Sequence, residues 1–165
     1  MAIEKVKAYF VSLGRQDDIL EFPVSSATVE LAARALNTEP SRIAKTLSFY
    51  DKKNEKCAIL VVTAGDAKID NNKFRTYFGF KAKMLFSEDV ETLTGHPVGG
   101  VCPFANPAGT KTYLDISLKR FDTVFPACGS GNSAIELHCK ELYTLSGAEE
   151  WIDVCKGWQN TSEEE

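Results

Sequence analysis

Two neighbouring apolar segments joined by a short polar run constrain the fold of this chain most strongly. Residues 46–50 and 57–63 are rich in β-branched, aliphatic and aromatic side chains, whereas residues 51–56 are all polar or charged. Strand-like runs separated by a short polar connection are typical of a β-hairpin. We therefore expect these two segments to pair as antiparallel strands.

Apolar residues at helical spacing surround this hairpin. The spacing predicts helices over residues 2–13 and 28–36, the second capped by Ser26 or Thr28, and a short helical turn with Thr38 as its cap. After the hairpin, Asp70 or Asn71 can cap one helix, and Ser87 can cap another that ends at Gly95.

The second half of the chain contains more strand patterns. We expect strands over residues 111–116, 123–128 and 133–138, followed by helical stretches over 141–145 and 148–155. Hairpin-linked strands mixed with helices, without regular βαβ alternation, predict an α+β fold. We expect one domain over residues 1–160, with a mixed, mostly antiparallel, barrel-like sheet flanked by helices, and an acidic tail over 161–165.

Composition excludes several classes of protein. No apolar run approaches the roughly 18 residues of a membrane span, and the charged start of the chain is unlike a secretory signal, so we expect a cytoplasmic protein without a membrane partner. The five cysteines form no CxxC pair, and the two histidines lack zinc-ligand spacing, so we expect neither a disulfide framework nor a metal. We expect no organic cofactor, because no phosphate-binding or dinucleotide-binding glycine motif is present.

Basic residues gather in one region of an otherwise acidic chain. The formal net charge is −4, yet residues 67–83 contain five basic side chains against the single acid Asp70. Such a patch fits a few phosphate contacts with a nucleic acid, and it equally fits a solvated helix face. The basic residues are Lys68, Lys73, Arg75, Lys81 and Lys83.

Residues 95–104 combine three glycines with two prolines and form the most unusual segment. Glycine permits backbone angles closed to other residues, and proline restricts the chain on either side. A backbone held in this way can present N–H groups to a carbonyl or an oxyanion, which is the central need of ester hydrolysis. The same composition also fits an ordinary tight connection.

Two side chains are further candidates for chemistry. Lys45 begins an apolar strand, where its ammonium group could hold a phosphate or simply extend to solvent. Cys102 lies in the glycine-rich loop with His96 nearby in sequence, so it is either a reactive thiol or a small residue that fills a turn.

Four sequence segments together resemble the YbaK/ProX family of tRNA-editing domains. The first is ATVELAARALNTEPSRIAKTLSF at residues 27–49, and it is followed by VVTAGDAK at 61–68, GHPVGGVCPF at 95–104 and CGSGNSAIEL at 128–137. The resemblance extends over about residues 20–147 and lies in the order and spacing of the motifs. It implies a mixed, barrel-like sheet flanked by helices, and the removal of wrongly attached amino acids from tRNA.

Because no synthetase is attached, the chain resembles the separate family members that act in trans. The resemblance implies a mischarged aminoacyl-tRNA as substrate, with cysteine or another small amino acid on tRNA(Pro), and it suggests prolyl-tRNA synthetase as a partner. Pocket size would select the amino acid. The alternative function is a binding module on the same fold that recognises an aminoacyl or tRNA end without catalysis.

The resemblance also implies site residues. Lys45 matches the family lysine that positions the phosphate and terminal adenosine, and Gly99 to Pro103 match the loop whose N–H groups face the ester. The last glycine-rich turn, residues 129–134, departs from the family pattern, because it lacks the basic residue, histidine or aspartate often found there. The expected catalytic residues are Lys45, Gly99, Gly100, Val101, Cys102 and Pro103, and the expected substrate-binding residues are Phe22, Thr46, Gly95, His96, Gly129, Ser130 and Asn132.

Overall fold

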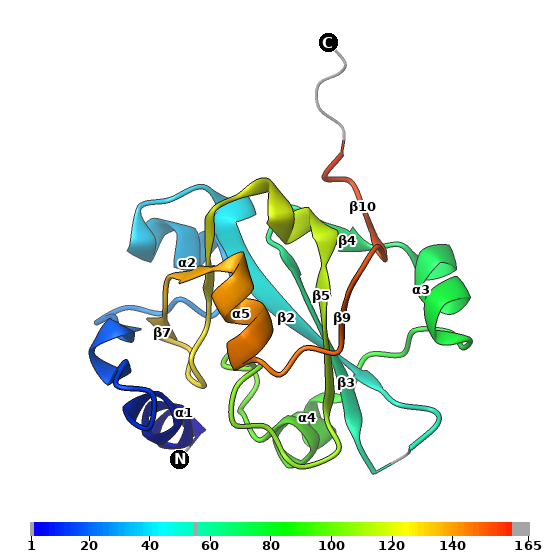
Figure 1. Ribbon diagram of the computed structural model, residues 1–165, viewed down its shortest axis with the longest axis horizontal. Helices are drawn as coiled ribbons and strands as arrows, with labels where there is room; N and C mark the ends of the chain where they lie inside the picture. Colours follow the sequence, from blue (N-terminus) through cyan, green and yellow to red (C-terminus); the bar gives the residue numbers. More distant parts are fainter. Residues whose placement is uncertain (1, 55, 160–165) are drawn as a thin grey trace.

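A curled six-stranded sheet forms the centre of the computed structural model, which describes residues 2–54 and 56–159 (Figure 1). The strands follow the order β8-β6-β2-β3-β5-β9. Their bounds are β2 (Ile43–Tyr50), β3 (Ala58–Ala64), β5 (Lys111–Asp115), β6 (Thr123–Pro126), β8 (Leu137–His138) and β9 (Glu150–Ile152).

The expected hairpin is confirmed as the pair β2 and β3. These strands are antiparallel, with a register that runs from Ala44 opposite Ala64 to Tyr50 opposite Ala58. The α+β class is confirmed too, but three of the five junctions in this sheet are parallel, namely β2–β6, β3–β5 and β5–β9. Parallel neighbours arise because long crossover segments, not hairpins, connect β3 to β5 and β5 to β9.

Two small antiparallel sheets complete the strand structure. In one, β1 (Leu20–Glu21) pairs with β7 (Ser133–Ala134), and in the other, β4 (Lys68–Ile69) pairs with β10 (Cys155–Lys156). The strand expected over residues 133–138 is therefore divided, because β7 pairs with β1 whereas β8 pairs with β6.

The helical stretch expected over residues 148–155 was wrong. This segment contains β9 and the first residue of β10. Ile152 and Val154 are buried and Asp153 between them is exposed, which is the period of two expected for a strand. Pairing with β5 therefore decides the structure of this segment, where the local apolar spacing is ambiguous.

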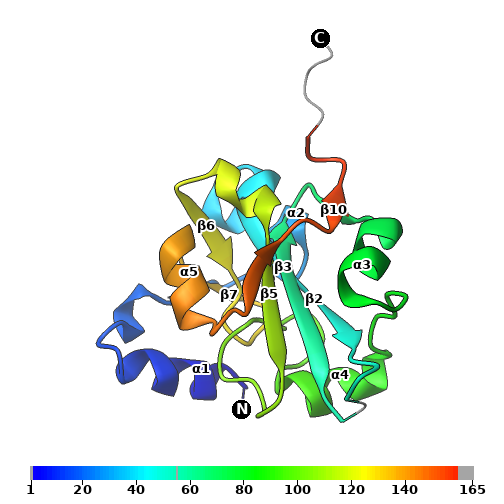
Figure 2. The same ribbon diagram turned by 45° about the vertical axis from the view of Figure 1, so that its right-hand side comes forward.

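In the described part of the chain five α-helices lie around the sheet, as Figures 1 and 2 show. Thr28 Oγ1 accepts a hydrogen bond from the Leu31 N–H, and the Asp70 carboxylate accepts from two N–H groups, so both caps are confirmed. Ser87 and Thr38 are not caps, because Phe86 and Glu39 occupy those positions. The helices are α1 (Ala2–Val11), α2 (Val29–Leu36), α3 (Asn71–Phe78), α4 (Ser87–Thr94) and α5 (Cys139–Leu145), with 3₁₀ turns at Gln16–Asp18, Pro40–Arg42 and Ile116–Arg120.

Aromatic pairs join two of the helices to the rest of the core. Phe49 of β2 meets Phe74 of α3, with ring centroids 4.9 Å apart. Phe10 of α1 meets Phe104 of the long loop, with centroids 5.2 Å apart. Phe104 is buried in the core, as are His96 and Cys102 of the same loop. In the described part of the chain, no helix is long and apolar enough to cross a membrane.

Candidate functional site

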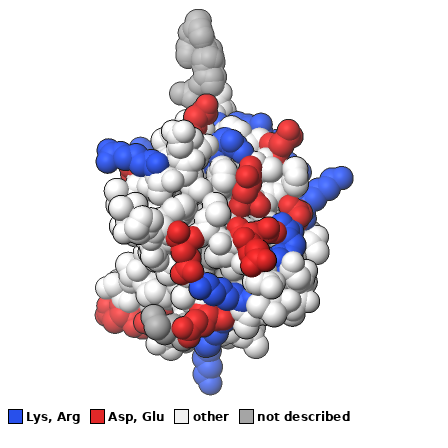
Figure 3. All heavy atoms as spheres, turned by 90° about the vertical axis from the view of Figure 1, so that its left-hand side faces the viewer, with Lys and Arg blue, Asp and Glu red and all other residues white. Residues whose placement is uncertain are grey.

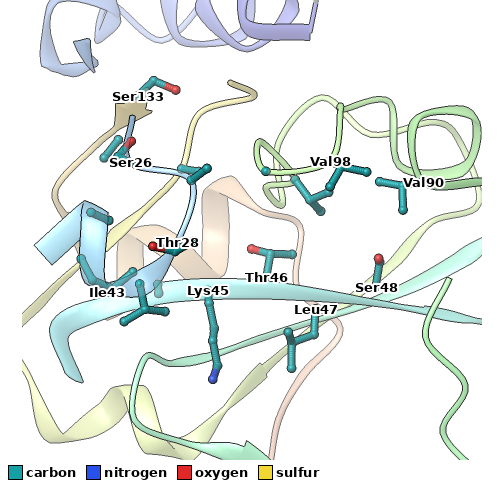
Figure 4. Close-up of a pocket in the computed structure, with 18 of the residues that line it drawn as sticks. Ser26, Thr28, Ile43, Lys45, Thr46, Leu47, Ser48, Val90, Val98 and Ser133 are labelled. Carbon is teal, nitrogen blue, oxygen red and sulfur yellow. The ribbon is translucent and has the colours of Figure 1, made fainter. Parts of the chain in front are cut away.

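A cavity of about 470 Å³ lies between β2, the start of α2, the loop at residues 98–101 and the start of α4 (Figure 4). This volume is within the range of small-molecule sites, roughly 300–1,000 Å³. Among the residues that line it, Lys45 alone carries a charge. The other lining residues are apolar or bear hydroxyl groups, and the hydroxyl-bearing ones are Ser26, Thr28, Thr46, Ser48, Ser87 and Ser133.

The cavity borders a gap along one edge of β2. Strand β6 pairs with only the first two residues of β2, Ile43 and Ala44. Farther along the same edge, β2 is hydrogen-bonded to the segment at 83–85. The Tyr50 N–H donates to the Lys83 carbonyl at 2.9 Å, and the Leu85 N–H donates to the Ser48 carbonyl at 3.1 Å. Within the described residues, no strand pairs with this edge at residues 45–47. The gap leaves room for a ligand beside the backbone of β2.

Lys45 and Thr46 point to opposite faces of β2. Figure 4 shows the Thr46 hydroxyl on the side of Val98, whereas the Lys45 side chain extends away from it. The Lys45 Nζ donates a hydrogen bond to the Gly65 carbonyl at 3.4 Å. Burial lowers the pKa of this ammonium below its ordinary value of 10.5, and the charges of Asp66 and Glu30 work in the opposite direction.

The Thr46 hydroxyl lacks a hydrogen-bond partner. Its Oγ1 is buried, and no donor or acceptor of the described chain lies within bonding distance. An unsatisfied buried hydroxyl usually costs about 1–3 kcal/mol. Such a cost at the edge of a cavity is typical of a group that meets its partner only when a ligand binds.

The glycine-rich loop contains a tight turn that separates the roles of its two central glycines. The Gly100 N–H donates to the Pro97 carbonyl at 2.9 Å, and Gly99 has a φ of +89°. A Cβ at Gly100 would lie 2.8 Å from the backbone of Ser130. Gly100 is therefore required by packing, and its N–H already has an acceptor.

Gly99, inside this turn, and Val101, directly after it, line the cavity together with Val98. Within the described residues, no hydrogen bond joins the N–H of Gly99 or Val101 to an acceptor. A Cβ at Gly99 would stand 3.3 Å from the Cβ of Ala27, across the cavity mouth. Two residues of the cavity wall thus have backbone N–H groups without an acceptor in the described chain.

His96, Cys102 and Phe104 lie on the buried side of the same loop. The His96 Nε2 is 2.7 Å from the Phe104 carbonyl, and the Cys102 Sγ is 3.5 Å from that Nε2. Burial lowers the pKa of His96 and raises the pKa of the Cys102 thiol to about 12. A neutral, fully buried thiol does not favour the thiol-enzyme hypothesis.

Other residues expected at the site, substrate-binding ones and the expected catalytic residue Pro103, do not line the cavity. Gly95 ends α4 with a φ of +81°. Asn132 Nδ2 donates to the Phe22 carbonyl at 3.0 Å, and the Gly131 carbonyl accepts from the Ser26 N–H at 2.7 Å. Gly129 lies against Ala2 and Val6, and Pro103 is buried. The structure therefore brings Lys45, Thr46, Gly99 and Val101 to the cavity and places the others behind it.

The five basic residues do not form one surface at the cavity. Lys73 pairs with Asp153 at 3.0 Å, and Lys83 lies over the rings of Tyr50 and Phe86. The remaining three are exposed, and they are Lys68, Arg75 and Lys81. Figure 3 shows another face of the molecule, on which basic and acidic side chains are interspersed.

Sequence reasoning missed several residues that line the cavity. Ser48 shares a strand face with Thr46 because it lies two positions farther along β2. This period of two could have identified it. Ser26, Ala27, Met84 and Ser133 come from segments distant in sequence, and no local pattern joins them.

A model of the aminoacyl-tRNA editing domain matches residues 24–145. The chain is 54% identical over 159 residues to the uncharacterized protein YwhH of Bacillus subtilis (strain 168), covering 96% of this chain and all of that protein. It is 33% identical over 92 residues to a proline–tRNA ligase of Aquifex aeolicus (strain VF5), covering 55% of this chain and 16% of the ligase.

Solved structures agree with these relatives. A protein described as "a putative trans-editing enzyme for prolyl tRNA synthetase" has a TM-score of 0.83 and 29% identity, covering 94% of this chain and 98% of that one. The hypothetical protein APE2540 has a TM-score of 0.80 and 30% identity, covering 92% of this chain and 99% of that one. The sequence match over most of the chain and the shared fold show that this protein belongs to the aminoacyl-tRNA editing domain family.

Proposed function

We propose that this protein hydrolyses the ester bond of mischarged aminoacyl-tRNA in trans, with the aminoacyl end held in the cavity beside β2. The observation that carries the proposal is that Gly99 and Val101, whose N–H groups have no acceptor within the described chain, line a cavity in which lysine is the single charged lining residue. Family membership supplies the class of substrate. We propose the cytoplasm, where tRNA is charged, as the place of action.

An aminoacyl ester is already activated, so hydrolysis needs a positioned water and stabilisation of the tetrahedral oxyanion. In our proposal the N–H groups of Gly99 and Val101 donate to that oxyanion. One such donor typically contributes about 10²–10³ in rate. Gly100 and Pro103 act by shaping the turn, and His96 and Cys102 act by fixing its buried side, so none of these four contacts the ester.

Thr46 is proposed to contact the substrate through its hydroxyl. This group lies on the same face of β2 as the loop (Figure 4) and lacks a partner within the described chain. It can accept a hydrogen bond from the α-amino group or donate one to the ribose. Binding of substrate would then satisfy a buried group that is unsatisfied in the free protein.

Lys45 is proposed to hold a phosphate of the tRNA end from the other side of β2. Its ammonium already lies half-buried near the Gly65 carbonyl, on the face of β2 opposite the Thr46 hydroxyl (Figure 4). A lysine acts as a point charge with rotatable donors, so it can bind a phosphate and release the carbonyl. Its role is to anchor the nucleic acid.

The lining favours a small neutral amino acid. A cationic side chain would find no carboxylate in the cavity, and a large one would meet Val98, Phe125 and Leu85. Exclusion of larger amino acids is sterically simple, whereas one methylene changes selectivity by only about 1–3 kcal/mol. We propose cysteine or another small amino acid on tRNA(Pro), with prolyl-tRNA synthetase as the supplier of substrate.

A panel of tRNAs charged with cysteine, alanine, serine, threonine or proline tests this function. The protein should release at least one small mismatched amino acid at a rate that saturates with protein concentration, and it should leave Pro-tRNA(Pro) intact. Tight binding of these tRNAs without release would identify the alternative, a binding module on the same fold. A chelator should change neither result.

A further inference from the structure

The mouth of the cavity carries an exposed aromatic surface beside a lysine. Phe86 is 53% exposed, and its ring centroid is 5.8 Å from that of Tyr50 in an edge-on arrangement. The Lys83 Nζ lies 4.9 Å from the centroid of Phe86 and 5.5 Å from that of Tyr50. We call these three residues the aromatic platform.

The platform is continuous with the cavity. Met84 and Ser87, the residues on either side of Leu85 and Phe86, both line the cavity, and Met84 is 53% exposed. The segment is fixed to β2 by the hydrogen bonds between Tyr50 and Lys83 and between Leu85 and Ser48. In addition, the Phe86 N–H donates to the Tyr50 Oη at 3.1 Å. The rings therefore stand on a rigid rim of the cavity.

An exposed ring beside a cation is the usual means of binding single-stranded nucleic acid, because every base has a face that can stack. Charge argues against a phosphate clamp here, since Glu88 and Asp89 lie in the first turn of α4, for which Phe86 is the N-cap residue. Asp89 is held by the Tyr50 hydroxyl. Stacking by a neutral base is thus favoured over contacts to phosphate.

We propose that the aromatic platform stacks the unpaired nucleotide that precedes the terminal adenosine of the tRNA. This inference rests on the proposed function, because the aminoacyl adenosine has to occupy the cavity. A nucleotide one step upstream then emerges at the cavity mouth, where Phe86 and Lys83 stand. The platform would bind the 3′ end of any tRNA, since stacking tolerates all bases.

The test compares two substrates in the same variants. One is a 3′-aminoacyl adenosine, and the other is the same aminoacyl group on a CCA trinucleotide. Phe86→Ala should lower kcat/KM for the trinucleotide by roughly tenfold, as expected for one lost stack, and leave the adenosine substrate unchanged. Phe86→Trp should retain the wild-type ratio. Tyr77→Ala, an exposed ring on α3, is the matched control and should leave the ratio unchanged.

A binding measurement keeps the test independent of catalysis. The probe is a non-hydrolysable 3′-aminoacylamide trinucleotide with 2-aminopurine at its middle position. The wild-type protein and Phe86→Trp should quench the 2-aminopurine fluorescence by stacking, and Phe86→Ala should not. Quenching of this probe by a protein that does not hydrolyse the ester trinucleotide would contradict the proposed function and support the platform. Equal losses on both substrates, or quenching that persists in Phe86→Ala, would overturn the platform.

Discussion

The two faces of β2 differ in what they offer a substrate. The face toward the loop presents the Thr46 hydroxyl and a cavity with backbone donors, whereas the opposite face presents the Lys45 ammonium near Gly65 (Figure 4). Consecutive strand residues point to opposite faces, so these neighbours in sequence cannot act from the same side. We therefore propose that the residues at 45–46 serve two roles, with a phosphate anchor on one face of β2 and an ester site on the other.

The largest side-chain effect should come from Lys45. Lys45→Ala should reduce deacylation by about 100-fold or more, in the range seen when one partner of a charged contact is removed. The loss should be mainly in KM, because an anchor binds ground state and transition state alike. Lys45→Arg should also be poor, since a planar guanidinium replaces a point charge.

Lys140→Ala supplies the control, as Lys140 is exposed on α5. Steady-state kinetics and thermal unfolding should be measured on the wild type and on all three variants, Lys45→Ala, Lys45→Arg and Lys140→Ala. A loss confined to kcat would place Lys45 at the reacting ester and contradict the division of roles between the faces.

On the loop face, Thr46→Val removes the hydroxyl while nearly conserving shape. We expect deacylation to fall by about tenfold, and the free energy of unfolding to stay the same or rise by about 1 kcal/mol, because a buried unsatisfied group disappears. Thr46→Ser should retain activity. Reduced stability with unchanged turnover would show that the hydroxyl serves the fold and not the substrate.

How far the sequence predicts this molecule differs between its regions. Features that depend on neighbours in sequence were predicted correctly, namely the hairpin and the end of a helix at Gly95. For two helix caps the sequence left two candidates each, and the structure has Thr28 and Asp70 as the caps. The segment of β9 was predicted as helix because its partner strand, β5, ends 35 residues before β9 begins, so the local sequence does not reveal the pairing. The cavity could not be assembled from pattern alone, because Ser26, Met84 and Ser133 meet only in the folded chain.

A smaller effect is expected at Cys102. Its thiol is fully buried with a pKa raised to about 12, so it should not serve as nucleophile. Cys102→Ala should keep activity within about tenfold and lower the free energy of unfolding by about 1 kcal/mol through lost packing. A loss of about 10⁴ or more in kcat, in a variant that unfolds at the wild-type temperature, would restore the thiol-enzyme hypothesis.

The smallest effect concerns pH. Burial lowers the pKa of His96 below its ordinary 6.5, whereas the hydrogen bond to Phe104 opposes the shift. Between the lowered pKa of His96 in the folded protein and its ordinary pKa in the unfolded chain, the unfolded chain binds more protons. The contribution of His96 to the free energy of unfolding is therefore complete above about pH 6.5 and declines as the pH falls below it.

Thermal unfolding between pH 7.5 and 5 should therefore show a shallower decline in His96→Gln than in the wild type. His96→Asn, a second replacement by a neutral amide, should show the same shallower decline. Equal slopes in all three proteins would mean that His96 does not titrate on unfolding.

We propose that backbone N–H groups of the loop stabilise the oxyanion, and amide-to-ester replacement can delete these donors one at a time. An ester bond in place of the peptide N–H of Val101, or of Gly99, deletes one donor and leaves every side chain unchanged. The same replacement at Ala108, an exposed position of the same long loop, is the control. Single-turnover deacylation should fall by about 10²–10³ for Val101 or Gly99, with tRNA affinity and unfolding temperature nearly unchanged, and it should be normal for Ala108. Normal turnover in both the Val101 and the Gly99 esters would contradict the account.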